Sequence, residues 1–525
     1  MPISPTYPGV YIEEVPSGVR TITGVATSIT AFVGRTLKGE TNEPIRIQSF
    51  SDYGRVFGGL WAESTLSYAV QHYFQHGGND AIIVRVFNGD EETNTSTINF
   101  PPNALVLMAS SPGLWGNSLR VFVNHDTRDA DLPLADQDTS LFNLIINEID
   151  TDTGNILSTE TFLNVSANED SPRFVTNVLD QQSSLVRVAT PPIGRPAPSD
   201  SDVDGNLVPA EGAGGGDSNA IDDNDIADDV GDTNNTGMYA LRRADLFNLL
   251  CIPPLEFDVD VDPGTFARAA TFCNAERAIV LIDPNLTWVD VDTAESGVNE
   301  LRSTVGTNNA INAFVYFPRI KLTDPLRENQ IREFAPCGAV AGIIARTDSQ
   351  RGVWKAAAGL DASFSGVRGV SFKLTDDENG RLNPLGLNCI RSFPVFGNVV
   401  WGARTLAGAN ALASEWKYAP VRRLALFLEE SLYRGSQWVV FEPNDEPLWA
   451  QIRLNVGAFM QNLFRQGAFQ GTTPRDAYLV KCDRETTTQN DINNGIVNIV
   501  VGFAPLKPAE FVIIKIQQLA GQIQT

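Results

Sequence analysis

The sequence predicts a multidomain protein of mixed α/β class: an α/β middle domain, an α/β C-terminal domain, a β-rich inserted outer domain, and an extended arm at each end. Helical and strand periodicities alternate along most of the chain, a strand-rich stretch with an acidic low-complexity loop interrupts them, and both ends combine prolines with short apolar runs. A chain of 525 residues is long enough for about two to four domains.

Residues 1–20 are expected to form an N-terminal arm. Their four prolines exclude a helix, whereas residues 9–15 (Gly-Val-Tyr-Ile-Glu-Glu-Val) are typical of a short strand. A terminal extension with this apolar content is expected to dock on another surface. The candidate docking residues are Val10, Tyr11, Ile12, Glu13 and Glu14.

The middle domain is predicted over residues 21–125 and 238–370. Its first part contains a buried strand at 27–34, a helical turn at 51–58, a helix at 64–76 that ends at two glycines, and strands at 81–87 and 119–124. Its second part contains a helix at 265–276, strands at 277–283 and 313–318, and an apolar segment at 338–345 that fits either helix or strand. Strands that alternate with helices indicate an α/β layer.

Residues 126–237 are predicted to be an insertion of different character. Residues 141–149 alternate apolar and polar side chains into a turn at 150–154, and residues 156–165 return from it, which predicts a β-hairpin. The insertion ends in an acidic loop that has eleven acidic and no basic residues between Asp200 and Asp232.

The C-terminal domain is predicted over residues 371–507, with helices at 419–433 and 447–465 and strands at 437–441, 478–482 and 496–503. The second helix has one wide apolar stripe, and Arg453 and Arg465 lie off it. The stripe consists of Leu448, Trp449, Ile452, Val456, Phe459, Met460 and Leu463.

Residues 508–525 are predicted to be a C-terminal arm that contains a strand. Pro505 and Pro508 exclude a helix, and the strand itself is almost entirely β-branched or aromatic. An apolar strand of this kind needs neighbours in a sheet, either in its own domain or in another subunit. Its residues are Phe511, Val512, Ile513, Ile514, Lys515 and Ile516.

The composition excludes several classes of protein. A net charge of -24 argues against general binding to nucleic acid or to anionic membranes, which depends on Lys and Arg. Five widely spaced cysteines in apolar surroundings predict free buried thiols. The N-terminus has no secretory signal pattern and no segment is long enough to insert in a membrane, so we expect a protein made and folded in the cytoplasm of the producing cell.

The sequence contains few of the residue patterns that are typical of enzyme active sites. Only three histidines are present, and His72 and His76 lack the Glu of a metalloprotease motif, so we expect them on a helix surface. Without a positioned histidine, serine or cysteine nucleophiles have no obvious base. The glycines at 212–216 are not followed by the Lys-Ser/Thr of a phosphate-binding loop. No enzymatic function is therefore expected.

One metal motif fits by spacing. Asp200, Asp202, Asp204 and Glu211 match the calcium loop Asp-x-Asp-x-Asp-Gly-x5-Glu. The surrounding prolines and glycines exclude the two flanking helices, so a solvated acidic loop is the competing interpretation, and no other cofactor is expected. The alternative functions are a calcium-binding surface adhesin, which this loop suggests, or another non-contractile structural assembly protein.

A set of motifs near both ends resembles the contractile tail sheath proteins of bacteriophages and related injection systems. They cover about the first 120 and the last 170 residues in the order of the family, although Trp354-Lys-Ala-Ala-Ala358 departs from its usual pattern. The motifs are Tyr7-Pro-Gly-Val-Tyr-Ile-Glu-Glu14, Ala31-Phe-Val-Gly34, Tyr73-Phe74 with Gly77-Gly78, Val84-Arg-Val86, Ser111-Pro-Gly-x-Trp-Gly-Asn117, Trp354-Lys-Ala356, Leu382-Asn383, Trp401-Gly-Ala-Arg-Thr405, Arg422-Arg423, Phe441-Glu-Pro-Asn-Asp445, Gly467-Ala-Phe-x-Gly471 and Ala504-Pro-x-Lys-Pro-Ala-Glu-Phe511.

The resemblance implies a structural subunit that stacks as rings into a helical sleeve around an inner tube and contracts to drive the tube through a target envelope. It implies arms exchanged between subunits, so that each C-terminal domain completes a sheet with strands from its neighbours. The implied partners are other copies of the chain, the inner tube, the baseplate and the tail terminator, without nucleic acid. For tube contact we expect Arg453 and Arg465, with core packing alone as the other interpretation of their helix.

Overall fold

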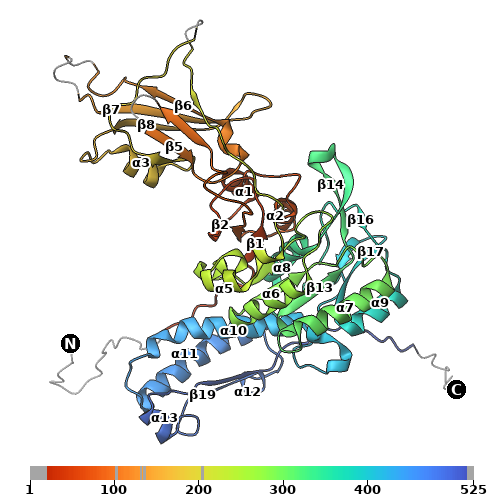
Figure 1. Cartoon of the computed structure of the whole chain (residues 1–525). Coiled ribbons are helices and arrows are strands. Elements are labelled where there is room, and N and C mark those ends of the chain that lie inside the picture. The colour runs from red at the N-terminus through yellow and green to blue at the C-terminus, as the bar shows by residue number, and fades with distance from the viewer. Residues whose placement is uncertain (1–19, 101–104, 131–132, 134–137, 203–205, 517–525) are drawn as a thin grey trace, which may run out of the picture.

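The computed structural model describes residues 20–516, except 101–104, 131–132, 134–137 and 203–205 (Figure 1). Its centre is an eight-stranded sheet in the order β18-β17-β13-β12-β11-β1-β3-β2. The six middle strands run parallel, and β18 and β2 pair antiparallel at the two edges. The strands are β1 (Thr30–Gly34), β2 (Ile45–Ile47), β3 (Ala81–Arg85), β11 (Leu249–Cys251), β12 (Ile279–Ile282), β13 (Ala313–Phe317), β17 (Leu387–Phe393) and β18 (Gly397–Val400).

Helices cover both faces of this sheet. Alternate residues of β1 enter different cores: Ala31 and Val33 face one core, and Phe32 faces the other. The first core is completed by α6 (Pro263–Ala275) and α7 (Val291–Val305), the second by α1 (Phe50–Phe57), α2 (Thr65–Gln75) and α8 (Cys337–Arg351). Because these strands are buried on both faces, their sequences are continuous apolar runs and do not alternate between apolar and polar residues. The predicted α/β layer is confirmed.

The segment at 338–345, for which the sequence fits either helix or strand, is part of helix α8. Its glycines at 338 and 342 lie one turn apart and face α2. A Cβ atom at Gly338 would lie 2.1 Å from the carbonyl oxygen of Ala69, and one at Gly342 would lie 2.4 Å from that of Tyr73. The two backbones can approach this closely only because both positions lack a side chain.

The β-rich unit is a separate body with its own core (Figure 1). A four-stranded sheet (β10-β6-β7-β8) and a three-stranded sheet (β4-β5-β9) enclose that core together with helix α3. The predicted hairpin is present as β7 and β8. The elements are β4 (Thr97–Phe100), β5 (Leu105–Ala109), β6 (Leu119–Asn124), β7 (Leu141–Ile149), β8 (Ile156–Ser166), α3 (Val175–Gln182), β9 (Val186–Thr190) and β10 (Ala210–Glu211).

The limits of this unit differ from the expected 126–237. Strands β4, β5 and β6 pack in its core, so the unit begins before residue 126. Residues Ile221, Ile226 and Met238 pack in the central core, beside helices α4 (Asp223–Ile226) and α5 (Asp229–Asn234). The acidic composition of this stretch suggested one continuous loop. The sequence does not reveal that residues 221–238 pack on the central core, because few of them are apolar and buried.

The C-terminal part packs on its own core around α10 (Ala419–Ser436) and α11 (Glu446–Arg465). All seven apolar residues predicted to face inward from α11 are buried there. The C-terminal domain was expected to begin at residue 371. Strands β17 and β18 instead belong to the central sheet, so residues 371–418 lie outside the C-terminal core.

The smaller elements of the whole chain are β14 (Ile320–Asp324), β15 (Gln330–Phe334), β16 (Gly369–Val370), α9 (Asp376–Leu382), α12 (Pro474–Ala477), β19 (Tyr478–Lys481), α13 (Gln489–Asn493) and β20 (Val500–Phe503).

Two local predictions are wrong. Residues 437–441 form no strand: α10 continues to Ser436, a 3-10 turn follows at Gln437–Val439, and Phe441 has a positive φ of 69°. β-branched residues there lack a neighbouring strand, and the preceding helix determines the backbone instead. His72 and His76 are buried rather than on a helix surface, with exposed fractions of 3% and 0%, because α8 covers that side of α2. The prediction of buried free cysteines is confirmed for all five.

We expect His72 to reduce stability in acid. Burial, and secondarily the nearby His76, lowers the pKa of His72 to about 3. The unfolded chain therefore binds a proton below pH 6.5 that the folded chain excludes, and this group alone lowers the free energy of unfolding by about 3 kcal/mol between pH 6.5 and 4. In His72→Leu, the thermal midpoint should fall less over that range than in the natural sequence. Parallel pH profiles for the two proteins would contradict this assignment.

Candidate assembly interface

Strands β19 and β20 form a small antiparallel sheet in the C-terminal part, with Tyr478 opposite Phe503 and Lys481 opposite Val500. One face packs on α11 through half-buried residues that include Val480 and Val501. On the other face Leu479 is 48% and Val500 is 45% exposed. The sheet is therefore half covered and presents apolar side chains to solvent.

Both edges of this sheet are open within the described part of the chain. Neither β19 nor β20 pairs with a third strand there. Only the end of the hairpin is closed: Ala504 N donates to Ala477 O at 2.8 Å, and Gln470 N donates to Ala504 O at 2.9 Å. Open edges leave backbone N–H and C=O groups free to pair with an added strand.

A buried ion pair fixes the base of the C-terminal arm. The Arg404 guanidinium donates through Nε to Glu510 Oε1 at 2.7 Å and through Nη2 to Oε2 at 2.5 Å, a bidentate geometry. The Arg404 side chain is 1% exposed and that of Glu510 is 15% exposed. Tyr418 also donates its hydroxyl to Glu510 Oε2, at 3.3 Å.

The remaining nitrogen of Arg404 is satisfied by the protein. Nη1 donates to Asn383 O at 2.9 Å, to Asn410 Oδ1 at 3.0 Å and to Gly408 O at 3.3 Å. A buried charge that is both paired and hydrogen-bonded avoids the large cost of an isolated one. The arm is thus attached at Glu510 to a rigid socket formed after β18.

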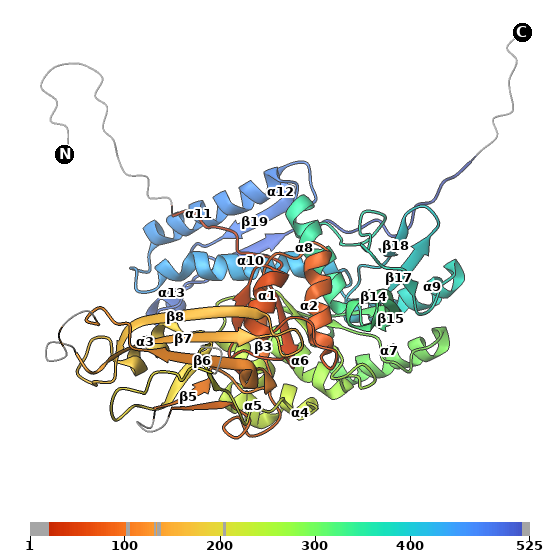
Figure 2. The same ribbon diagram turned by 90° about the horizontal axis from the view of Figure 1, so that it is seen from above.

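Beyond this attachment the chain leaves the body (Figure 2). Residues Phe511 to Ile516 form no strand within this chain. Their apolar side chains are 74–92% exposed. A run of five exposed large apolar residues is unusual for a monomer and marks an interaction site. Pairing of this run with a neighbouring subunit stays a prediction.

The described chain begins on the opposite side of the C-terminal part (Figures 1 and 2). Arg20 N donates to Asn455 Oδ1 of α11 at 3.1 Å, and the Arg20 guanidinium lies 4.6 Å from the ring centre of Trp438. Ile22 is buried beside Leu424 and Leu428. Residues Val10 to Glu14, the predicted N-terminal strand, lie outside the described residues.

The two arginines expected to contact the tube differ in their surroundings. Arg453 pairs with Glu446 at 2.6 Å and donates to the carbonyl oxygen of Cys482. It therefore ties α11 to the end of β19. Arg465, in the last turn of α11, is exposed. Of the two, Arg465 has its charge more accessible to a partner, and tube contact stays a prediction for both.

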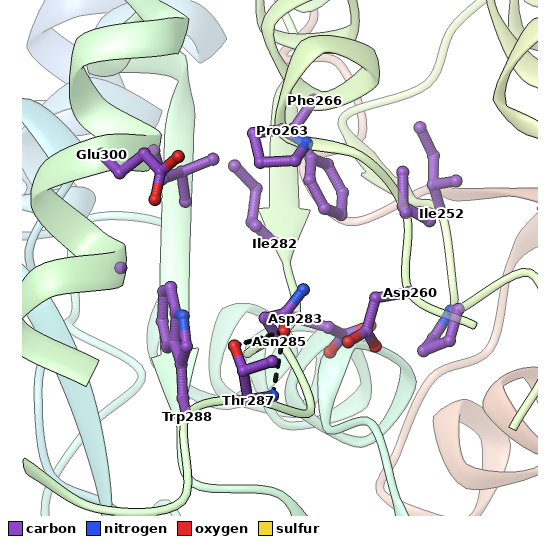
Figure 3. Close-up of a pocket in the computed structure, with 14 residues that line it drawn as sticks. Ile252, Asp260, Pro263, Phe266, Ile282, Asp283, Asn285, Thr287, Trp288 and Glu300 are labelled. Atoms are coloured by element: carbon purple, nitrogen blue, oxygen red, sulfur yellow. Dashed lines mark hydrogen bonds between the residues drawn. The ribbon is translucent and has the colours of Figure 1, made fainter. Parts of the chain in front are cut away.

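A pocket of about 290 Å³ lies beyond the ends of β11 and β12, at the carboxyl edge of the parallel strands (Figure 3). This is where open α/β sheets commonly bind ligands. Figure 3 shows Trp288 and Glu300 on the opposite side of the pocket from Ile252. Its lining contains no His, Cys, Ser or Lys.

Two carboxylates of this pocket, Asp260 and the buried Asp283, have structural partners. Asp260 pairs with Arg319 and accepts a hydrogen bond from Leu286 N at 2.6 Å. Asp283 accepts one from Cys337 N at 2.8 Å, at the start of α8, and burial raises the pKa of Asp283 to about 6. Perturbed carboxyl groups also occur in active sites, but here both side chains join the strand ends to neighbouring elements.

The predicted calcium loop is only partly described, since Asp204 lies outside the described residues. Asp202 accepts a hydrogen bond from Asn206 N at 2.8 Å, and Glu211 forms an ion pair with Arg120 at 3.1 Å. The described residues contain no cluster of three or more potential metal ligands. Calcium binding stays a prediction.

These features define a class of protein: a multidomain α/β protein with a two-stranded sheet whose edges are open within the described residues and with an exposed apolar run at its C-terminal end. No helix among the described residues is long and apolar enough to cross a membrane.

Residues 413–518 match the family model described as the phage tail sheath C-terminal domain. A tail sheath protein of Vibrio phage KVP40 is 26% identical over 178 residues, which are 33% of this chain and 25% of the relative. The resemblance found in the motifs is confirmed.

Solved structures extend the likeness over nearly the whole chain. The contracted sheath of the PVC extracellular contractile injection system has a TM-score of 0.58 at 21% identity, with 99% of each chain covered. The contracted helical sheath of the anti-feeding prophage has a TM-score of 0.56 at 23% identity, with 98% of this chain and 100% of the other covered. A sheath tail protein from Listeria innocua has a TM-score of 0.59 at 13% identity, with 93% of this chain and 96% of the other covered. The shared fold confirms the predicted mixed α/β architecture.

Arg404 and Glu510 lie within two of the motifs that carry the resemblance, but sequence reasoning assigns neither residue a role. Charged residues inside otherwise apolar or Pro-rich segments were the available signal. Their pairing could not be derived, because they lie 106 positions apart in the sequence.

We expect Glu510→Ala to loosen the base of the arm. The substitution leaves the buried Arg404 charge unpaired, which costs about 3 kcal/mol. The thermal midpoint should fall, and backbone amides of residues 506–511 should exchange faster with deuterium. The exposed Glu415→Ala is the matched control and should change neither quantity. Unchanged exchange in Glu510→Ala would show that the ion pair does not hold the arm.

Proposed function

We propose that this protein is the structural subunit of a contractile tail sheath, which polymerises around an inner tube and contracts to drive the tube through a target envelope. The observation that carries the proposal is the open β19–β20 sheet in a subunit whose C-terminal arm exposes an apolar run from Phe511 to Ile516. The fold shared with sheath subunits in the contracted state supports it.

Strand addition supplies enough free energy to link subunits. Each new backbone hydrogen bond contributes about 1 kcal/mol. Burial of a side chain such as Val512, Ile514 or Ile516 contributes about 2 kcal/mol. The arm attaches at Glu510 and pairs beyond it, so the short extended segment between subunits can bend while both ends stay bound. Such links allow domains to rotate during contraction without the polymer falling apart.

The proposed mechanism needs no nucleotide and no enzymatic step. Free energy is stored in a metastable extended assembly, and a change at the baseplate shifts the first ring to the contracted packing. The partners are further copies of this chain, the inner tube, the baseplate and the tail terminator. Two similar structures are of the anti-feeding prophage baseplate, which supports the baseplate as a partner. We place production in the bacterial cytoplasm and function in the assembled particle.

A chain that ends at Glu510 should remain folded but fail to polymerise. It keeps the ion pair with Arg404 and loses the exposed apolar run, so the body retains its contacts while strand addition is lost. Electron microscopy should show no tubes or stacked rings, and circular dichroism and the thermal midpoint should match the full chain. A chain that ends at Ile516 is the control, since it keeps the run and should assemble. Tubes formed by the shorter chain would refute the arm mechanism.

The tube contact can be tested at Arg465. Arg465→Glu places a negative charge at the exposed end of α11 and should weaken binding to purified inner tube protein by about tenfold at low salt. Arg475→Glu, at an exposed arginine outside α11, is the control for net charge. Equal binding by both variants would exclude Arg465 from the tube contact. Arg453 is less suitable, because its substitution also removes the link between α11 and β19.

A further inference from the structure

The pocket at the carboxyl edge of the central sheet has an acidic and apolar lining (Figure 3). Its volume is about 290 Å³, and residues of both α6 and α7 line it. The charged residues of the lining are Asp260, Asp283 and Glu300, and the lining contains no Lys, Arg or His. Carboxylates without neighbouring basic groups in the lining disfavour phosphate or carboxylate ligands and favour a cation.

Asp283 is the most buried of these carboxylates, at 8% exposed. Its Oδ1 accepts the hydrogen bond from Cys337 N, whereas its Oδ2 has no hydrogen-bond partner within the described residues. In Figure 3, Asp283 lies between Trp288 on one side and Asp260 on the other. Asp260 has both oxygens occupied, by Arg319 and by Leu286 N. A buried acceptor without a donor is destabilising, and a donor from outside the chain relieves that cost.

Glu300 supplies a second carboxylate, from helix α7. Gly297, Glu300 and Leu301 are three and four positions apart, so they share one face of the helix, and all three line the pocket. Glu300 forms no ion pair within the described part of the chain. A Cβ atom at Gly297 would lie 2.0 Å from Nε1 of Trp288, so the missing side chain lets the indole ring lie against α7. Trp288 and Glu300 therefore belong to the same wall (Figure 3).

The rest of the lining is mostly apolar. A cavity of about 150 Å³ holds a benzene molecule, so this pocket has room for a stem of several methylene groups. The ring faces of Phe266 and Trp288 can also attract an ammonium group. The apolar lining residues besides these two rings are Ile252, Pro254, Val261, Pro263, Ile282 and Leu301.

We propose that this pocket binds an aliphatic diamine, with one ammonium group at Asp283, the other at Glu300, and the methylene stem against the apolar lining. The two carboxylates come from different elements, the end of β12 and the face of α7, so a ligand with two positive ends joins them. Binding stabilises the folded chain by mass action. The inference goes beyond the proposed sheath function and does not depend on it.

Calorimetric titration of the full chain with putrescine tests the site. We expect saturable binding at one site per chain, together with a higher thermal midpoint. Butanediol and succinate have the same four-carbon stem, but the first is uncharged and the second carries two negative charges, so neither should bind. Saturable binding of butanediol as strong as that of putrescine would overturn the pairing with the carboxylates. No saturable binding of putrescine or of the longer diamine cadaverine would overturn the site.

Two variants locate the binding. Glu300→Gln should weaken putrescine binding about tenfold and leave the thermal midpoint of the free protein unchanged, because Glu300 is exposed. Asp283→Asn keeps an acceptor for Cys337 N and should weaken binding at least as much. Glu415→Gln, at an exposed acid outside the pocket, is the control for general attraction of the amine to an acidic protein. Unchanged binding in either pocket variant, or equal weakening in the control, would overturn the proposal.

Discussion

The buried ion pair between Arg404 and Glu510 determines where the C-terminal arm leaves the body. Arg404 belongs to the loop that follows the central sheet, and Glu510 follows the C-terminal hairpin. One bidentate contact thus joins the central α/β body to the C-terminal part and to the arm. The first residues of the arm are therefore anchored to the central body at Glu510.

The two kinds of sheet in this molecule differ in how they are covered. Helices cover both faces of the central sheet, and its edge strand β18 is hydrogen-bonded to residues 359–364. The β19–β20 sheet has one covered face and open edges within the described chain. A body with a covered central sheet thus carries a small sheet whose open edges can accept an added strand.

The charge distribution follows the same division. The acidic residues gather in the segment that leads from the inserted domain back to the centre, where they cap short helices and pair with Arg242 and Arg268. The pocket beside the base of the arm is lined by the basic side chains of Arg351, Lys355 and Lys507. A protein that is strongly acidic overall therefore carries basic side chains beside its C-terminal arm.

The sequence by itself determined the elements whose periodicity is strong, such as α11 and the β7–β8 hairpin, and it determined the exposed apolar arm, because these are properties of neighbouring residues. The tertiary structure alone decided which strands share a sheet, that β4 to β6 belong to the inserted unit, and that α8 buries His72 and His76. It also decided the pairing of Arg404 with Glu510 and the approach of residues 351–359 and 401–403 to the base of the arm. Contacts between residues more than a hundred positions apart leave no periodic trace in the sequence, since only folding brings those residues together.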